Sequence, residues 1–261
     1  MKITWLGTAS IAIESEGRKI LFDPFAELIG GSHPESLDLF AEYDVIFITH
    51  GHFDHLFFVP EILEMSGATV FCGEKAAQTL EKYMEDTDTV CVIQPGIKIP
   101  VGPFAVRVYR GKHAEFAPGK GALREYVRPG HILRNIRNLP FIVYAHTHFK
   151  EGGETLVYGI EAEGKQILLA GSLNFAPEDL ETHPEHPDLL ILPYQGCLDR
   201  EARTQEMIER VHPKRILLSH FDDAFPPVSR NVDLRGLGRL MKTEYPQIPV
   251  VRPTFGKPVR L

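Results

Sequence analysis

The stretch that decides the fold is residues 44–55, which read DVIFITHGHFDH. Its first half, residues 44–49, is an apolar run typical of a buried strand, and His50 begins a loop at the carboxyl end of that strand. Residues 50–55 then supply three histidines and one aspartate. Neutral imidazole and carboxylate both bind zinc, and ligands of α/β proteins often bind where strands end. The order and spacing favour a hydrolytic metal centre over a solvated histidine-rich loop.

The order His-x-His-x-Asp-His over residues 50–55 resembles the signature of the metallo-β-lactamase superfamily. Within it, the chain is most similar to the branch of L-ascorbate-6-phosphate lactonase and N-acylphosphatidylethanolamine phospholipase. The resemblance implies an α/β fold, a four-layer αββα sandwich, and we expect residues 1–261 to form one such domain. Later histidines follow predicted strands over residues 104–109 and 215–219. The resemblance implies two metal positions, the first at His50, His52 and His113 and the second at Asp54, His55 and His220.

One position departs from the superfamily pattern. The resemblance calls for an aspartate after the strand predicted over residues 167–171, but residue 172 is serine. A neutral hydroxyl ligates weakly and brings no charge to offset two dications. We therefore expect one firm ion at the first position and a weak or absent second ion, with Asp222 or Asp223 as a candidate replacement. A ligand set rich in nitrogen favours Zn²⁺. The same ligand types are also compatible with Mn²⁺ or iron.

The resemblance implies a metal-dependent hydrolase in which a metal-bound water attacks the substrate and Asp54 accepts a hydrogen bond from it. We expect a small ester, lactone or phosphorylated molecule as substrate. Two alternatives remain, a metal-dependent phosphodiesterase or nuclease and a non-catalytic binding or sensing protein. Ser172 keeps the second of these open.

Composition narrows the class of partner. Hydrophobic residues make up 43% and charged residues 24%, as in an ordinary globular protein, and the net charge of −7 gives no sign of a nucleic-acid surface. Cys72, Cys91 and Cys197 are too scattered for a disulfide framework or Cys-x-x-Cys site, so we expect reduced thiols and a cytoplasmic location. The sequence has no apolar run of 18 residues, so we expect no membrane partner. The oligomeric state is left open.

Strands and helices alternate along the rest of the chain. We expect a hairpin of residues 10–14 and 18–22, a second hairpin joining 141–144 to 155–158, a strand over 188–193, and helices over 74–85, 199–211 and 231–245. In the second hairpin, His146 and His148 would share one strand face, as polar residues near a pocket rim or as a pair that shares an ion. Five further histidines are interpreted as loop residues: His33, His131, His183, His186 and His212.

Three further features bear on the site. Asp23, before Pro24, is either an acceptor for a ligand N–H or the start of a turn. Tyr194 and Gln195 follow a strand, where either could donate to a developing oxyanion or serve only the turn. A basic stretch over residues 107–137 favours an anionic substrate, although scattered solvated charge explains each residue as well. It holds Arg107, Arg110, Lys112, Lys120, Arg124, Arg128, Arg134 and Arg137 against Glu115 and Glu125.

Overall fold

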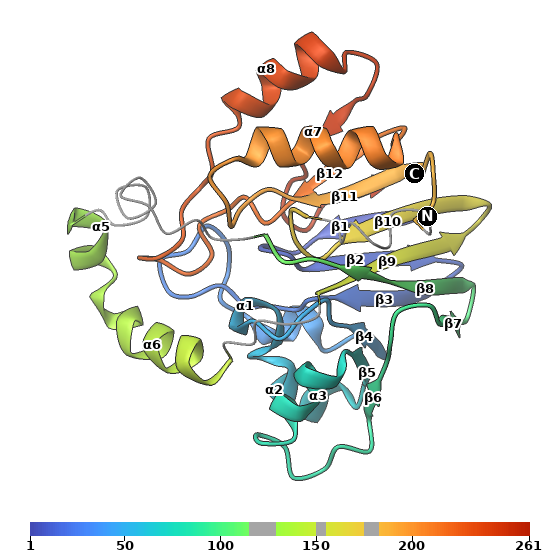
Figure 1. Ribbon diagram of the computed structural model, residues 1–261. Coiled ribbons are helices and arrows are strands. Elements are labelled where there is room, and N and C mark those ends of the chain that lie inside the picture. The colour runs from blue at the N-terminus through green and yellow to red at the C-terminus, as the bar shows by residue number, and fades with distance from the viewer. Residues whose placement is uncertain (115–128, 150–154, 175–182) are drawn as a thin grey trace.

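The computed structural model describes residues 1–114, 129–149, 155–174 and 183–261. Two seven-stranded sheets pack face to face and helices cover their outer faces (Figure 1), so the predicted αββα sandwich is confirmed. The first sheet has the order β14 (Pro258–Arg260), β1 (Lys2–Trp5), β2 (Ile11–Ser15), β3 (Arg18–Phe22), β4 (Val45–Phe47), β5 (Thr69–Cys72) and β6 (Val90–Val92). The second has the order β13 (Val250–Val251), β12 (Ile216–Ser219), β11 (Leu189–Pro193), β10 (Lys165–Ala170), β9 (Thr155–Ala162), β8 (Phe104–Gly111) and β7 (Lys98–Val101).

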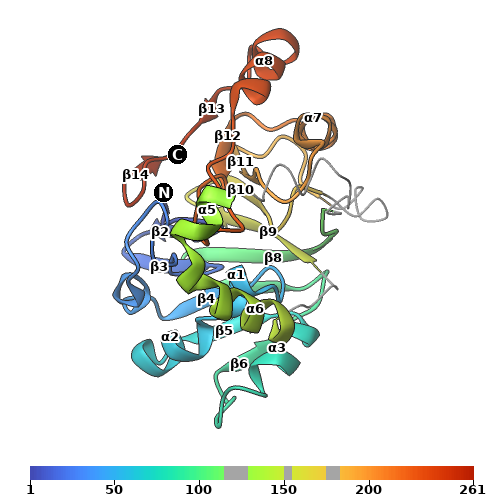
Figure 2. The same cartoon turned by 90° about the vertical axis from the view of Figure 1, so that its left-hand side faces the viewer.

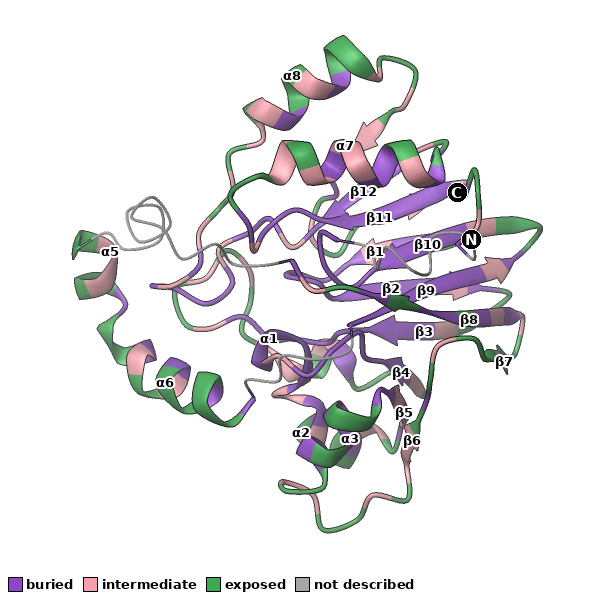
Figure 3. Ribbon diagram, in the orientation of Figure 1, coloured by how far each residue is buried: buried purple, intermediate pink, exposed green. Residues whose placement is uncertain are grey.

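The central strands are buried on both faces because each sheet packs against the other sheet and against helices (Figure 3). Successive side chains of a strand point to opposite faces. In β3, Ile20 and Phe22 therefore join the core between the sheets, whereas Leu21 joins the core under the helices. The ring of Phe22 lies 5.4 Å from that of Tyr158 on β9, centroid to centroid, so aromatic side chains fill the space between the sheets.

Helices α1 (Phe53–Leu56), α2 (Val59–Ser66) and α3 (Glu74–Leu80) cover the first sheet, and α7 (Arg200–Val211) and α8 (Arg235–Glu244) cover the second (Figure 1). A short 3₁₀ helix, η1 (Leu37–Phe40), precedes β4. The predicted helices over residues 74–85, 199–211 and 231–245 are confirmed, the first and last being shorter than expected. Directly before α8, the Asp233 carboxylate accepts the Arg235 N–H at 3.0 Å.

The strand ends of both sheets that carry the histidine loops meet at one edge of the sandwich. In the second sheet, β10, β11 and β12 are mutually parallel, and β8 runs in the same direction because both β8 and β10 pair antiparallel with β9. The Leu156 N–H donates to Thr49 O at 2.7 Å and so joins the loop after β4 to the start of β9. Loops that are distant in sequence therefore open onto one space.

The predicted hairpin between residues 141–144 and 155–158 is wrong in its first arm. Residues 139–148 form a helix, α6 (Leu139–His148), preceded by α5 (Pro129–Arg134) and η2 (Ile136–Asn138), and β9 pairs instead with β8 and β10. Pro140 fits the first turn of a helix, where its missing N–H costs nothing. Ile142, Ala145 and Phe149 then bury one helical face. Figure 2 shows α5 and α6 in front of the strand ends.

None of the three cysteines, Cys72, Cys91 and Cys197, is part of a disulfide. No helix among the described residues combines the length and the apolar character that crossing a membrane requires.

Candidate metal centre

The first group of candidate ligands is His50, His52 and His113, and the structure brings them together. One ring nitrogen of each lies within 4.8 Å of the others. His50 is buried, and its Nε2 has no hydrogen-bond partner among the described residues. Buried polar nitrogens are rarely left unpartnered, so this atom points to a missing ligand. Three converging nitrogens fit a divalent cation such as zinc.

The environment keeps these three histidines neutral. Burial lowers the pKa of His50 well below its usual range, and the charges of neighbouring histidines add to this effect. Burial also lowers the pKa of His113, and that of His52 to about 4. Each ring therefore offers a lone pair at neutral pH without first losing a proton, which is the state that binds a metal.

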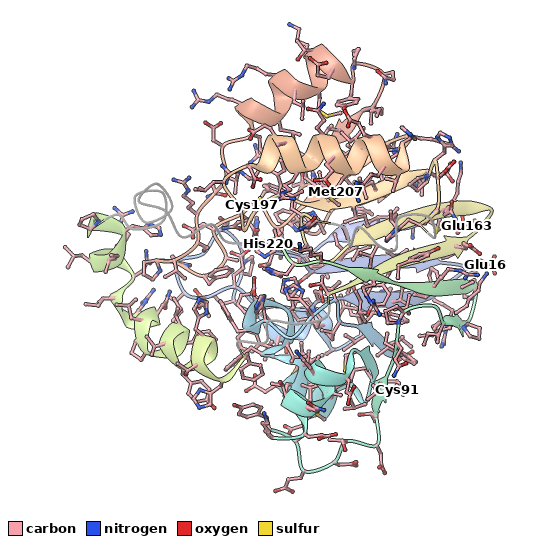
Figure 4. All side chains as sticks on the ribbon, in the orientation of Figure 1. Glu16, Cys91, Glu163, Cys197, Met207 and His220 are labelled. Atoms are coloured by element: carbon pink, nitrogen blue, oxygen red, sulfur yellow. The ribbon has the colours of Figure 1, made fainter. Side chains whose placement is uncertain are left out.

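The second group is Asp54 and His55, both on α1, and His220, which follows β12. Their ligand atoms also lie within 4.8 Å of one another, and His220 Nε2 is 3.0 Å from Asp54 Oδ2. Burial opposes the ionisation of Asp54, but the charges of His55 and His220 outweigh it and hold the pKa of Asp54 well below its usual range. Figure 4 labels His220 at the edge where the strand ends meet. An ionised carboxylate and two imidazoles complete a second candidate cation position.

The backbone at His220 is set by neighbouring loops. Its φ of 51° lies in the left-handed region, which a non-glycine residue rarely adopts. The His220 N–H donates to Thr8 O at 2.6 Å, and the ring Nδ1 lies 3.1 Å from Gln195 Oε1. If Nδ1 carries the hydrogen, Gln195 accepts it and Nε2 keeps the lone pair that faces Asp54.

Asp23 supports both groups at once. Its Oδ1 accepts the Thr49 N–H at 2.7 Å and its Oδ2 accepts the Thr49 hydroxyl at 2.8 Å. His55 Nδ1 lies 2.9 Å from Oδ2, and His50 Nδ1 lies 3.0 Å from the Thr49 hydroxyl oxygen. Hydrogens on both Nδ1 atoms would leave both Nε2 atoms with lone pairs. The Asp23 carboxylate therefore lies within hydrogen-bond distance of the ring of a candidate ligand, His55, and its φ of 45° places the backbone at this point in the left-handed region.

The two groups line one cavity of about 440 Å³. Its remaining wall is largely apolar, with Phe53, Phe149, Phe225 and Val228. Asp54 is the only carboxylate among the described residues that line it. The size suits a small molecule, which pockets of about 300–1,000 Å³ typically hold.

Comparison with known proteins agrees with this geometry. A model of the β-lactamase superfamily domain matches residues 2–220. The chain belongs to the β-lactamase superfamily. A relative from Koribacter versatilis, a UPF0173 metal-dependent hydrolase, is 32% identical over 225 residues, covering 85% of this chain and 84% of its own length. Another from Carboxydothermus hydrogenoformans, with the same description, is 28% identical and covers 89% of each chain. The predicted class of enzyme, a hydrolase of the metallo-β-lactamase fold, is confirmed.

A solved structure shares the fold. Igni18, a metallo hydrolase from Ignicoccus hospitalis, superposes with a TM-score of 0.66 over 99% of this chain and 97% of its own, at 17% identity. At 17% identity, this similarity supports the fold of the chain and carries no conclusion about its substrate.

In the structure, the Ser172 side chain has a hydrogen-bond partner that the sequence did not reveal. Its hydroxyl accepts the Ala114 N–H at 2.9 Å, so it fastens the residue that follows His113. Ser172 also lines the cavity. The suggestion that Asp222 or Asp223 replaces the missing aspartate is wrong. The Asp222 carboxylate accepts the Thr8 N–H at 2.9 Å, and Asp223 lies 3.4 Å from His131 Nε2, so both turn away from the second group.

The two histidines of α6 have different surroundings. His146 lines the cavity, with its ring 4.8 Å from that of Phe53. His148 is exposed and stacks on Tyr144, one helical turn earlier, at 4.0 Å. Two residues apart on a helix, the rings diverge by about 200°, so a shared ion is excluded. His131, which was expected in a loop, lies on α5.

The other sequence-predicted groups divide between the cavity and the surface. Gln195 lines the cavity, whereas the Tyr194 side chain is fully buried and is not among the lining residues. Five of the basic residues lie in the described part of the chain, and all are exposed and outside the cavity lining: Arg107, Arg110, Lys112, Arg134 and Arg137. Lys120, Arg124 and Arg128, with Glu115 and Glu125, lie outside the described residues.

Proposed function

We propose that the protein binds divalent cations in this cavity and there hydrolyses a small ester, lactone or phosphorylated molecule. The observation that carries the proposal is the unpartnered Nε2 of buried His50, which converges with nitrogens of His52 and His113. A nitrogen-rich set favours zinc as the resident metal. Bound cations would polarise the scissile bond and make water a better nucleophile near neutral pH.

The residues of the chain divide into holding and orienting roles. His50, His52 and His113 would hold the first cation, and Asp54, His55 and His220 the second. Asp54 would also orient the attacking water, since it is the only ionised acceptor among the described lining residues. Gln195 would fix the orientation of the His220 ring, and Asp23 would fix that of the His55 ring, so both would act indirectly through the candidate ligands. The His146 ring, which also lines the cavity, is placed to contact the substrate.

The apolar wall favours a small substrate with a hydrocarbon portion. Phe53, Phe149 and Phe225 would exclude water from the reacting bond, which strengthens its polarisation. A nuclease is less well supported, because the net charge is −7 and none of the described lysines and arginines lines the cavity.

The test is hydrolysis of two panels, lactones with small esters and phosphodiesters, by protein stripped with a chelator and then reloaded with Zn²⁺. We expect lactones or esters to be turned over, the activity to disappear on stripping, and Zn²⁺ to restore it. Turnover of phosphodiesters alone would favour the phosphodiesterase alternative. Firm metal binding with no turnover on either panel would favour a binding or sensing protein.

Ser172 leads us to propose that the two cations are held unequally. The second group carries one negative charge, from Asp54, and Ser172 adds none. We expect Ser172→Asp to raise the Zn²⁺ affinity of the second position about tenfold or more, because one added unit charge close to a dication in a partly buried site is worth more than about 1.4 kcal/mol.

Calorimetric titration of stripped protein measures this change as a second binding step that becomes tighter. Ser172→Ala is the control, since it removes the hydroxyl that accepts the Ala114 N–H and adds no charge. Two tight, equal steps in the wild type would contradict the unequal-site proposal.

A further inference from the structure

A third group of potential ligands lies outside the cavity and includes a residue of the loop that carries His220. It consists of Glu27, His33 and Asp222, whose ligand atoms lie within 4.8 Å of one another. The Nε2 of His33 is 3.8 Å from Glu27 Oε1 and 3.8 Å from Asp222 Oδ2. None of the three lines the catalytic cavity.

The two carboxylates are buried and only partly satisfied. Glu27 is 3% exposed and Asp222 is 1% exposed. Glu27 Oε2 accepts the His33 N–H at 2.7 Å and Asp222 Oδ2 accepts the Thr8 N–H at 2.9 Å. Glu27 Oε1 and Asp222 Oδ1 have no hydrogen-bond partner in the described structure, nor has the fully buried hydroxyl of Thr8.

No basic side chain offsets this charge. Among residues 1–114, 129–149, 155–174 and 183–261, no lysine or arginine forms an ion pair with Glu27 or Asp222. Burial, reinforced by Asp222, raises the pKa of Glu27 to about 9, and burial lowers the pKa of His33. The imidazole therefore has a lone pair at neutral pH. Either a proton or a cation has to offset the charge of the facing carboxylates.

The surroundings of the three residues bring the two carboxylates together and hold the imidazole in place. A Cβ on Gly7 would lie 2.9 Å from Glu27 Oε1 and 3.7 Å from Asp222 Oδ2, so both carboxylates converge over a residue without a side chain. The His33 ring stacks on Phe255 at 4.5 Å and meets the edge of Trp5 at 5.0 Å. Locked ligands of this kind favour binding because little side-chain freedom is lost.

We propose that Glu27, His33 and Asp222 bind a divalent transition-metal cation, with the Thr8 hydroxyl as a further oxygen ligand. Two carboxylates with one imidazole suit Zn²⁺, Mn²⁺ or Fe²⁺, whereas Ca²⁺ takes oxygen ligands alone. The ion would join three segments that are distant in sequence: the loop after β1, the loop after β3 and the loop after β12.

This ion would have a positioning role, distinct from the catalytic cations. Asp222 lies two residues after His220, and Thr8 O accepts the His220 N–H. A cation that fixes Thr8 and Asp222 would therefore hold the left-handed backbone at His220. The proposal does not depend on the substrate or on hydrolysis, and metal content tests it directly.

The experiment measures ions per chain by mass spectrometry after dialysis against micromolar Zn²⁺ and, separately, Mn²⁺. We expect His33→Ala to bind one ion fewer than the wild type with at least one of the two metals. The loss should recur when His33→Ala is added to His52→Ala, because the third position is independent of the first. Partly exposed His131, whose ring also faces a carboxylate, provides the control His131→Ala, which should keep wild-type content.

A second variant, Glu27→Gln, should also bind one ion fewer, since it keeps the shape but removes a charge. If Glu27→Gln fails to fold, His33→Ala alone tests the proposal. His33 lies at the margin of the group, so its replacement leaves both carboxylates in place. Equal metal content in the wild type and His33→Ala would overturn the proposal, and a shared proton would then account for the carboxylate pair. An equal loss in His131→Ala would also overturn it.

Discussion

Replacing His52 with alanine is expected to remove one cation per chain and to lower kcat/KM for the hydrolysed substrate at least about 10³-fold. A catalytic metal supplies several kcal/mol of transition-state stabilisation, and each 1.4 kcal/mol is a factor of ten in rate. The His52 ring lies 4.7 Å from the His50 ring and 4.5 Å from the His113 ring. Without it, two imidazoles remain, which is one fewer than catalytic zinc sites use.

The loss should come from the metal and not from unfolding. His52 precedes α1, but its side chain makes no capping hydrogen bond to that helix. We therefore expect the stripped wild type and stripped His52→Ala to unfold at similar urea concentrations. His148→Ala is the control, since His148 is exposed and contacts Tyr144 instead of the cavity. A His52→Ala protein with wild-type metal content would remove His52 from the ligand set.

Gly171→Ala is expected to destabilise the fold by about 3 kcal/mol, the upper part of the range for overpacked cores. A Cβ at Gly171 would lie 2.5 Å from Thr49 Cβ and 2.6 Å from Leu156 O. Neither atom can yield easily, because the Leu156 N–H donates to Thr49 O. Since the Thr49 hydroxyl contacts His50, a shift there should also weaken the first cation.

Urea unfolding of stripped protein measures the stability change, and metal titration measures the second effect. The matched control is Gly238→Ala on α8, where an added Cβ meets nothing within 4 Å. An exposed helical glycine replaced by alanine should gain up to about 1 kcal/mol. Equal unfolding midpoints for Gly171→Ala and the wild type would show that the contact with Thr49 relaxes without cost.

Much of the architecture could be predicted because its signals are local. The run over residues 44–49 ends in a dense histidine motif, and β8, β10, β11 and β12 are apolar runs that periodicity identifies. His113 and His220 could be chosen because each follows such a strand. Their convergence into two groups required the whole sandwich, which the family resemblance supplied.

The α6 helix was mispredicted because its sequence fits two periods. Ile142, Tyr144, His146 and His148 alternate as a strand would, yet Ile142, Ala145 and Phe149 also fit one helical face. Tertiary packing decides between them. The rings of Phe141 and Phe149 lie 4.6 Å and 5.0 Å from that of Phe57, which follows α1, and no pattern within the segment records that contact.

Other features were out of reach because their partners are distant in the chain. The hydroxyl of Ser172 binds Ala114, 58 residues earlier. Glu27, His33 and Asp222 belong to no motif and meet only after both sheets have formed. A single sequence shows that such residues exist, but their chemistry depends on neighbours that folding supplies.

The cavity separates chemistry from selectivity along the chain. The candidate cation ligands lie on three separate stretches that both sheets position, at residues 50–55, 113 and 220. Two other lining residues, His146 and Phe149, come from the single segment 139–149. A substitution at His146 or Phe149 would change the shape of the cavity without replacing any candidate cation ligand. Selection can therefore diversify what is bound in descendants of this protein while the reactive centre is inherited unchanged.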